Sequence, residues 1–481
     1  MRFSWILIVL LAGCTVGPDF IRPKPPSSDH YNFGGDPSKT ASAGGQSQRL
    51  LHGIGPVEHW WKLFNSKELN ELVAEGMINN VTLQAAQASL RQSEDNLKAG
   101  YGIFYPQISV ALDPSRQKFS PARFGSNAAG SIFNLVTLSA SVSYALDVFG
   151  GERRTIENLQ SRVDAQRYIL QGTYLVLSAN IVNTAIARAA YSEEVSLVEN
   201  QIALQKEQIA ITEKQVRAGI ASYQTLLAMR SQLATLDANL PPLIQKEAQS
   251  EHLLATLTGH NPSAWKPPVL SFSSLDLPKE LPLSMPSDLV RKRPDILVAE
   301  ADLHGASANI GVATAALFPT FTLNGTYGQN NSTMRGLFGS NANFWSLGTN
   351  IAAPVFNGGT LTSERQAAID AYQQSLANYR QTVLSAFAQV ADLVRALEHD
   401  ALSANAEFQS VENAKEALHL AKVNYDAGTV NYLQVLSSDL QYQQARISFL
   451  QARAQWLQDT TALFTALGGS GLFHVRNHKD Y

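Results

Sequence analysis

The residues that most often perform chemistry are scattered in this 481-residue chain. Its ten histidines form no HExxH or paired-ligand spacing, no glycine-rich phosphate loop follows a predicted strand, and no GxSxG motif occurs. The run Arg291-Lys-Arg-Pro-Asp295 could suggest a phosphate site, but Pro-Asp near a helix start is more simply a helix cap. The sequence therefore predicts neither an enzyme, nor a metal site, nor a bound cofactor.

Cys14, the only cysteine, offers a different kind of chemistry. It cannot form an internal disulfide, and it follows a basic start, a short apolar run and Ala12-Gly13, the pattern of a secretory signal over residues 1–13. Leu11-Ala-Gly-Cys14 resembles a bacterial lipobox, which implies cleavage before Cys14 and a covalent lipid on it. The alternative is a chance cysteine beside a short apolar helix. Several acyl chains, at about 0.8 kcal/mol per buried methylene, make a stable anchor.

Charge and hydropathy limit the partners. The 37 basic and 40 acidic residues nearly balance, which gives no support for nucleic-acid binding. After the signal no uninterrupted apolar stretch reaches the roughly 20 residues that a membrane-spanning helix needs. A membrane-spanning role would therefore need β-strands, at about 9–11 residues each.

The chain repeats itself once, at an offset near 210 residues. Asp147-Val-Phe-Gly-Gly151 matches Pro354-Val-Phe-Asn-Gly-Gly359, and Arg217-Ala-Gly219 matches Asp426-Ala-Gly428. We interpret these ordered matches as a tandem duplication. The predicted segments are an extended lipid-anchored part at 14–57, a first repeat at 58–270, a linker at 271–285, a second repeat at 286–470 and a tail at 471–481.

Each repeat is predicted to hold a first helix, two strands, a very long helix and a long returning helix. The first helices are expected over about 66–103 and 286–317. Apolar residues recur every seven positions along the long helices, as in Val383, Val390 and Leu397, which predicts a coiled-coil seam. A helix of about 65 residues is roughly 100 Å long. Pro241-Pro242 is expected to interrupt and kink the first returning helix.

Four strands alternate cleanly between apolar and polar residues. They are predicted at about 106–113, 137–148, 319–327 and 344–353. Ser, Thr, Asn and Asp line one face, which suits a water-filled lumen, while the apolar face suits lipid. A soluble half-buried sheet would alternate in the same way. Four strands cannot close a membrane barrel, so the strands must be shared between two, three or four subunits.

Several motifs together resemble the TolC-like outer-membrane efflux proteins, in their lipid-anchored branch. They cover nearly the whole chain: Leu11 to Pro23, Trp60-Trp61-Lys-Leu-Phe64, Asn80 to Leu90, Leu240 to Leu243, Arg291 to Ile296 and Gly428 to Leu433. The resemblance implies a mainly α fold with β: a long antiparallel coiled-coil barrel plus four transmembrane strands per chain, closing as a trimeric twelve-stranded β-barrel. It implies an outer-membrane homotrimer that extends into the periplasm and is docked by a periplasmic adaptor and an inner-membrane pump.

The resemblance also implies where the duct closes. The periplasmic tip turns are expected at Gly219 to Leu227, including Tyr223, and at Gly428 to Ser437, including Tyr432. The family's constriction maps onto Tyr425, Leu433 and Ser437, although ordinary coiled-coil core also explains the first two. The aspartate that the family often has at the position of Ser437 is absent, and Val430 replaces its basic residue, so the acidic ring is not carried over. The helix–strand junctions are expected at Pro106, Gly150, Gly151, Pro319, Gly358 and Gly359.

The function thus predicted is a passive trimeric duct that exports small toxic molecules, drugs or metal ions. Two alternatives stay open on the sequence alone. The first is an outer-membrane duct for protein secretion, because a wide polar lumen suits either cargo. The second is a periplasmic coiled-coil scaffold lipoprotein, whose strands would be soluble.

Overall fold

A computed structural model describes residues 15–55, 57–120, 122, 125 and 129–469. Cys14, the predicted signal and the predicted tail at 471–481 lie outside the described residues. The chain divides into two compact units. One comprises residues 1–22, 90–166 and 299–379, and the other comprises 23–89, 167–298 and 380–481.

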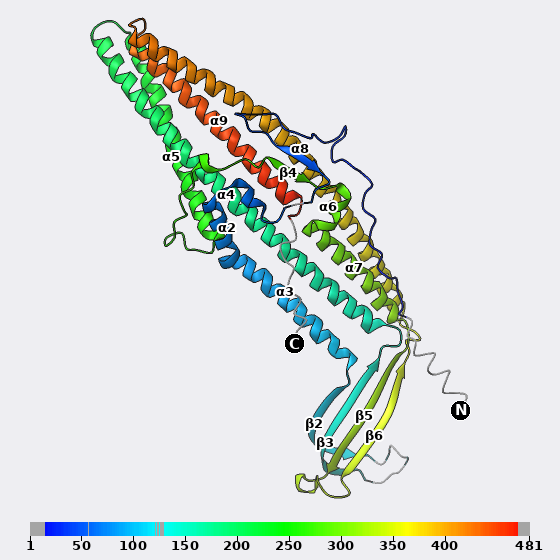
Figure 1. Cartoon of the computed structure of the whole chain (residues 1–481). Coiled ribbons are helices and arrows are strands. Elements are labelled where there is room, and N and C mark those ends of the chain that lie inside the picture. Colours follow the sequence, from blue (N-terminus) through cyan, green and yellow to red (C-terminus); the bar gives the residue numbers. More distant parts are fainter. Residues whose placement is uncertain (1–14, 56, 121, 123–124, 126–128, 470–481) are drawn as a thin grey trace. The chain divides into compact units, whose positions relative to one another are not determined.

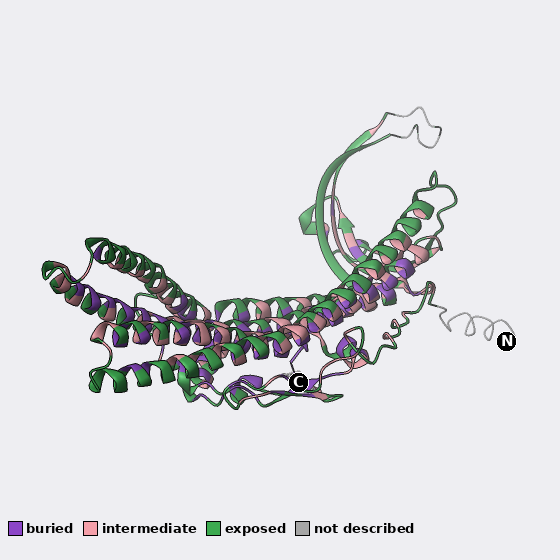
Figure 2. Ribbon diagram, turned by 90° about the horizontal axis from the view of Figure 1, so that it is seen from above, coloured by how far each residue is buried: buried purple, intermediate pink, exposed green. Residues whose placement is uncertain are grey.

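The first unit contains a four-stranded antiparallel sheet in the order β2-β3-β5-β6 (Figure 1). The strands are β2 (Gln107–Phe119), β3 (Ser131–Leu146), β5 (Thr320–Asn331) and β6 (Asn343–Ala352). The first two extend further toward their connecting loop than predicted. Strand β2 contains Pro114, which is tolerated because β2 is an edge strand of the described sheet. Figure 2 shows that the sheet is strongly curved.

Two helical hairpins supply most of the remaining chain (Figure 1). Helix α4 (Gly151–Arg217) returns through α5 (Tyr223–Leu257), and α8 (Thr360–Asp426) returns through α9 (Tyr432–Ala466). Both long helices have 67 residues and both returning helices have 35, so the duplication extends to element length. The predicted interruption at Pro241-Pro242 is wrong, because α5 continues through both prolines. Each proline removes one backbone donor from the helix.

Each predicted first helix is two helices. The first pair is α2 (Lys67–Asn79) and α3 (Val81–Gly100), and the second is α6 (Pro286–Lys292) and α7 (Pro294–Ala315). Asn80 is extended and its Oδ1 accepts from the Leu83 amide at 3.0 Å, so it caps a new helix. Arg293 is extended because it precedes Pro294.

The sequence analysis missed a small parallel sheet in the second unit. Strand β1 (Arg49–His52) pairs with β4 (Glu280–Leu283), joining two segments that were predicted to be an extended part and a linker. Leu50, Leu281 and Leu283 are buried. The alternation in these short runs was too brief to separate them from the surrounding Pro and Gly residues.

The core of the second unit is aromatic and aliphatic. Trp60 and Trp61 begin a short 3-10 helix at Trp60–Phe64, and Trp60 stacks on Phe464 of α9 with ring centroids 5.3 Å apart. Among the described residues, α4 alone has an 18-residue window apolar enough to cross a membrane. Since 61 % of that window is buried inside the protein, its apolar residues are explained by helix packing.

Candidate functional site

The sheet of the first unit has one apolar and one polar face. Strand register aligns Ile108, Val142, Gly325 and Leu347 in one row across the four strands. The side chains of this face are exposed: Ile108 is 76 % and Leu347 is 81 % accessible. A soluble sheet of this kind would need a cover, because large exposed apolar patches are rare on monomers.

The opposite face carries hydroxyls in the same register. Ser109, Ser141, Thr326 and Ser346 form a row across all four strands, and the Ser141 and Thr326 hydroxyl oxygens lie 3.2 Å apart. The two outer strands, β2 and β6, each pair with only one neighbour among the described strands. A two-faced curved sheet with two open edges is the geometry of one segment of a shared barrel.

Tight turns connect this sheet to its helices. Pro106 and Pro319 immediately precede β2 and β5. Gly150, at φ +79°, and the pair Gly358 and Gly359, at φ +62° and +89°, precede α4 and α8 in the left-handed region that glycine tolerates. Gly151 is the first residue of α4. All six predicted junction residues are thus placed where helices and strands meet.

The N-terminal strap, residues 15–22, packs against α4 and α7 of the first unit. Gly17 has φ +92°, and a Cβ placed on it would lie 2.4 Å from the Gly311 Cα, so only glycine permits this approach. Arg22 Nε donates to Glu300 Oε2 at 2.7 Å. Gly17 and Arg22, both part of the motif Leu11 to Pro23 that supports the family resemblance, therefore have structural roles in holding the strap.

Arg154 is the main polar contact of the strap. Its side chain is only 6 % exposed, and its two terminal nitrogens bind Asp19 Oδ1 and Glu157 Oε2, each at 2.7 Å. Glu157 Oε1 lies 2.8 Å from His304 Nε2, and the His304 ring stacks on Phe20 at 4.4 Å. The strap is thus fixed by a linked set of charged and aromatic contacts.

Replacing Arg154 with Met should loosen the strap. The change keeps the aliphatic stem and removes the two charge-assisted bonds, at a cost of about 2 kcal/mol, since Asp19 is largely exposed. The Val16 amide, which donates to Phe149 O at 3.0 Å, should then exchange hydrogen roughly 30-fold faster. Arg153→Met is the control, because Arg153 binds Asp147 and not the strap. Equal exchange in the two variants would contradict this role.

The two helical hairpins turn in the same way. Gly219 and Gly428 follow α4 and α8 at φ +71° and +74°. In each turn the next residue donates five residues back, Ile220 to Gln215 O at 2.8 Å and Thr429 to Asn424 O at 2.9 Å. These are Schellman motifs. Ser222 and Asn431 then cap the returning helices. The turns are shorter than predicted, because these caps start the helices early: Tyr223 and Tyr432 are already the first helical residues.

The predicted constriction residues all lie in the second hairpin. Tyr425 is 43 % exposed, and its ring lies 5.2 Å from that of Tyr432. Leu433 is half-buried and Ser437 is exposed, both on the first turns of α9. The sequence analysis gave no partner for Tyr432. Burial and the carboxylate of Glu207, on α4, raise the pKa of Tyr432, whose side chain hydrogen-bonds that carboxylate.

A carboxyl pair joins α8 to α9 further from the tip. Asp400 hydrogen-bonds Asp459, and burial together with this partner raises the pKa of Asp400 to about 7. Asp400 Oδ2 is buried and has no hydrogen-bond partner among the described residues, while Gln455 Nε2 donates to Asp459 Oδ2 at 2.9 Å. Two carboxyl groups this close share a proton more readily than they ionise together.

This pair should make stability fall as pH rises. A folded-state pKa above the unfolded value means that the native state holds the extra proton, so the stabilisation is complete below about pH 4 and is lost as pH rises toward 7. Asp400→Asn should flatten this dependence and, above pH 7, stabilise the helices by on the order of 1–2 kcal/mol. Thermal melts between pH 5 and 8 test it; an unchanged slope would contradict it.

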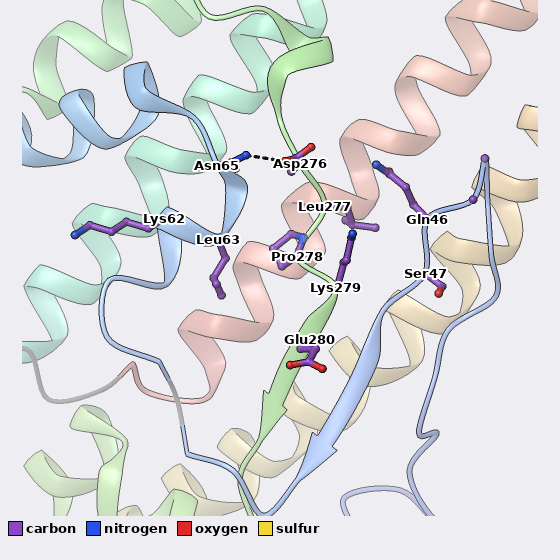
Figure 3. Close-up of a pocket in the computed structure, with 12 residues that line it drawn as sticks. Gln46, Ser47, Lys62, Leu63, Asn65, Asp276, Leu277, Pro278, Lys279 and Glu280 are labelled. Carbon is purple, nitrogen blue, oxygen red and sulfur yellow. Dashed lines mark hydrogen bonds between the residues drawn. The ribbon is translucent and has the colours of Figure 1, made fainter.

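A groove of about 930 Å³ opens beside the small sheet (Figure 3). Lys62, Lys279, Asp276 and Glu280 give it mixed charge, and Asn65 Nδ2 donates to Asp276 Oδ2 at 3.0 Å. Among the described residues no group of three or more His, Cys, Asp or Glu side chains could hold a metal ion. The groove therefore offers no concentrated charge of either sign.

The sheet faces, open edges and long hairpins define a class of protein, the outer-membrane channel that extends into the periplasm. A family model described as outer membrane efflux protein matches residues 72–260 and 285–469. The chain belongs to this family. It is 30 % identical over 451 residues to the pyoverdine export outer membrane protein OpmQ of Pseudomonas putida, covering 93 % of this chain and 94 % of the relative.

Two further comparisons agree. The cation efflux system protein CusC of Escherichia coli O6:H1 is 25 % identical over 461 residues, covering 95 % of this chain and 96 % of CusC. The solved outer-membrane channel OprN matches with a TM-score of 0.84 and 25 % identity, covering 96 % of this chain and all of that one. The predicted family, fold class and duplication are confirmed, and the chain is an outer-membrane efflux channel protein with the trimeric fold of these channels.

Proposed function

We propose that three copies of this chain form one passive duct, a twelve-stranded barrel in the outer membrane continued by helices in the periplasm. The observation that carries the proposal is the sheet with one apolar and one hydroxyl-rich face. In the trimer the apolar row would face lipid and the hydroxyl row would face the lumen. Its open β2 and β6 edges would pair between copies. On a denaturing gel the unboiled protein should run as a trimer and the boiled protein as a monomer; a monomer in both lanes would overturn the trimer.

The cargo proposed is small toxic molecules, drugs or metal ions, moved with energy from an inner-membrane pump through a periplasmic adaptor. The relatives named for pyoverdine export and for cation efflux support small cargo over exported proteins. The duct itself would catalyse nothing. Deleting the gene should lower the minimum inhibitory concentration of some drug or metal salt; unchanged tolerance together with loss of a secreted protein would favour the secretion alternative.

A covalent lipid on Cys14 is part of the proposal. The strap places Thr15 against Gly150, beside the end of β3, so a lipid on the preceding residue would be attached close to the sheet. The mass of the N-terminal peptide tests this directly. An unmodified Cys14 or an uncleaved signal would overturn the anchor and leave the duct untouched.

The tip is proposed to be held shut in part by the Tyr432–Glu207 bond. This contact links α9 of the second hairpin to α4 of the first. Tyr432→Phe removes about 1 kcal/mol of closure and should raise the open fraction roughly fivefold. Single-channel recording measures it. The matched control is Tyr442→Phe, nearly three turns further along α9; an equal response in both variants would overturn a specific latch.

A further inference from the structure

An apolar cavity lies in the first unit, where the sheet meets its helices. Its volume is about 250 Å³, larger than the roughly 150 Å³ apolar cavity that can hold a benzene molecule. Its lining comes from the end of β3, the start of α4, the end of α7 and the start of β5. No described contact of the channel's lumen or tip uses this space.

The walls of the cavity are mainly aromatic and aliphatic. Phe149 and Phe321 both line the cavity, with ring centroids 6.5 Å apart. Phe149 also stacks at 4.6 Å on Phe318, the residue before the lining residue Pro319. Two of the polar side chains in the lining have partners of their own. Asp147 accepts from the Glu152 and Arg153 amides at 3.1 and 3.0 Å. The Thr155 hydroxyl donates to Gly151 O at 3.0 Å. The Glu152 carboxyl and the Thr320 and Thr322 hydroxyls also line the cavity. Burial raises the pKa of Glu152, which favours its uncharged form there.

The cavity is continuous with the apolar face of the sheet. Leu146 and Phe321 both line it, and they are opposite each other in the β3–β5 register. Tyr144 and Leu323, the next pair on the same face, continue the apolar row along the strands. A hydrocarbon chain could therefore enter from the lipid-facing side without crossing a polar barrier.

The strap brings its N-terminal end to the rim of this cavity. The Val16 amide donates to Phe149 O at 3.0 Å, and a Cβ on Gly150 would lie 2.9 Å from the Thr15 Cα. Phe149 and Gly151, on either side of Gly150, line the cavity. Because consecutive Cα atoms are about 3.8 Å apart, Cys14 is tied by one peptide bond to a residue at the rim.

We propose that this cavity binds an acyl chain of the lipid carried by Cys14, which rests on the lipid anchor proposed above. The strap then orients the lipid anchor as well as attaching it, because it directs one acyl chain into the cavity between β3, α4, α7 and β5. The occupant is the lipid on Cys14 rather than a free membrane phospholipid, because the strap holds Thr15, the residue that follows Cys14, against Gly150 at the rim.

Photocrosslinking of the full-length protein tests the proposal. Cells are fed an alkyne-tagged fatty acid that carries a photoactivatable group, and the assembled protein is purified, irradiated and digested. The N-terminal peptide should carry the fatty acid, linked to peptides that contain residues 145–155 or 312–322. A labelled Cys14 whose chain is linked only to membrane lipid, or pocket peptides linked only to phospholipid, would overturn the pocket while leaving the anchor intact. An unlabelled Cys14 would overturn both.

A pair of variants sharpens the test. Ala316 lines the cavity and Ala313, one turn earlier, does not. Ala316→Phe should fill the space and reduce the crosslinks to the pocket peptides by roughly fivefold or more, whereas Ala313→Phe should leave them unchanged. Equal yields in both variants, with Cys14 labelled in each, would contradict binding in the cavity.

Discussion

Leu347→Arg should largely abolish insertion of the protein into the outer membrane. Leu347 is 81 % exposed in the middle of β6, on the row that it shares with Ile108 and Val142. If this row faces lipid, arginine there costs about 2–4 kcal/mol near the bilayer midplane. Such a cost corresponds to a roughly 30- to 1,000-fold loss of inserted over non-inserted protein. The amount of heat-sensitive trimer in isolated outer membranes measures it.

Ser346→Arg is the matched control, one residue earlier on the same strand. Ser346 lies on the hydroxyl row with Ser141 and Thr326, so its arginine would enter the aqueous lumen. This variant should insert normally and alter only the conductance. Equal loss in both variants, or loss in Ser346→Arg alone, would contradict the assignment of the two faces.

Trp456→Ala should destabilise the helical part of the protein by about 3–5 kcal/mol. Trp456 is 2 % exposed on α9, and its Nε1 donates to Gln48 Oε1 at 2.7 Å. Gln48 is fully buried, and its Nε2 donates to Pro278 O at 3.0 Å and to Thr460 Oγ1 at 3.1 Å. The substitution thus opens a cavity and leaves the buried Gln48 carbonyl without its donor. The melting of the helical circular-dichroism signal measures it.

Trp456→Phe separates the two causes. It fills much of the space but removes the indole donor, so about 1–3 kcal/mol should be lost. If both variants melt like the unmodified protein, then the Trp456–Gln48 contact between α9 and the segment before β1 does not stabilise the fold.

The long-range periodicities were readable from the sequence because each is repeated many times. Val383, Val390 and Leu397 recur at heptad spacing and are all buried. Alternation along the strands placed Ile108 and Leu347 on one face, and register confirms it. Glycine spacing located the turns at Gly219 and Gly428, since a positive φ leaves few other choices.

Features that depend on single contacts were not readable. The break at Asn80 follows from one side-chain cap, and β1–β4 pairing joins segments about 230 residues apart, so neither leaves a periodic signal. The bond between Tyr432 and Glu207 and the pair Asp400–Asp459 require knowledge of which helices are neighbours. Arg154 carried no sequence signal that set it apart from the neighbouring Arg153.

The most direct test of the channel itself is conductance of the purified protein in planar bilayers. A small, stable single-channel conductance from a trimer-sized species is expected, because the proposed duct has an open barrel and a tip that is closed at rest. Tyr432→Phe should then show longer openings. Failure to insert, together with a monomeric protein that can be extracted from membranes once its lipid is removed, would contradict the channel and leave a periplasmic coiled-coil scaffold as the better account.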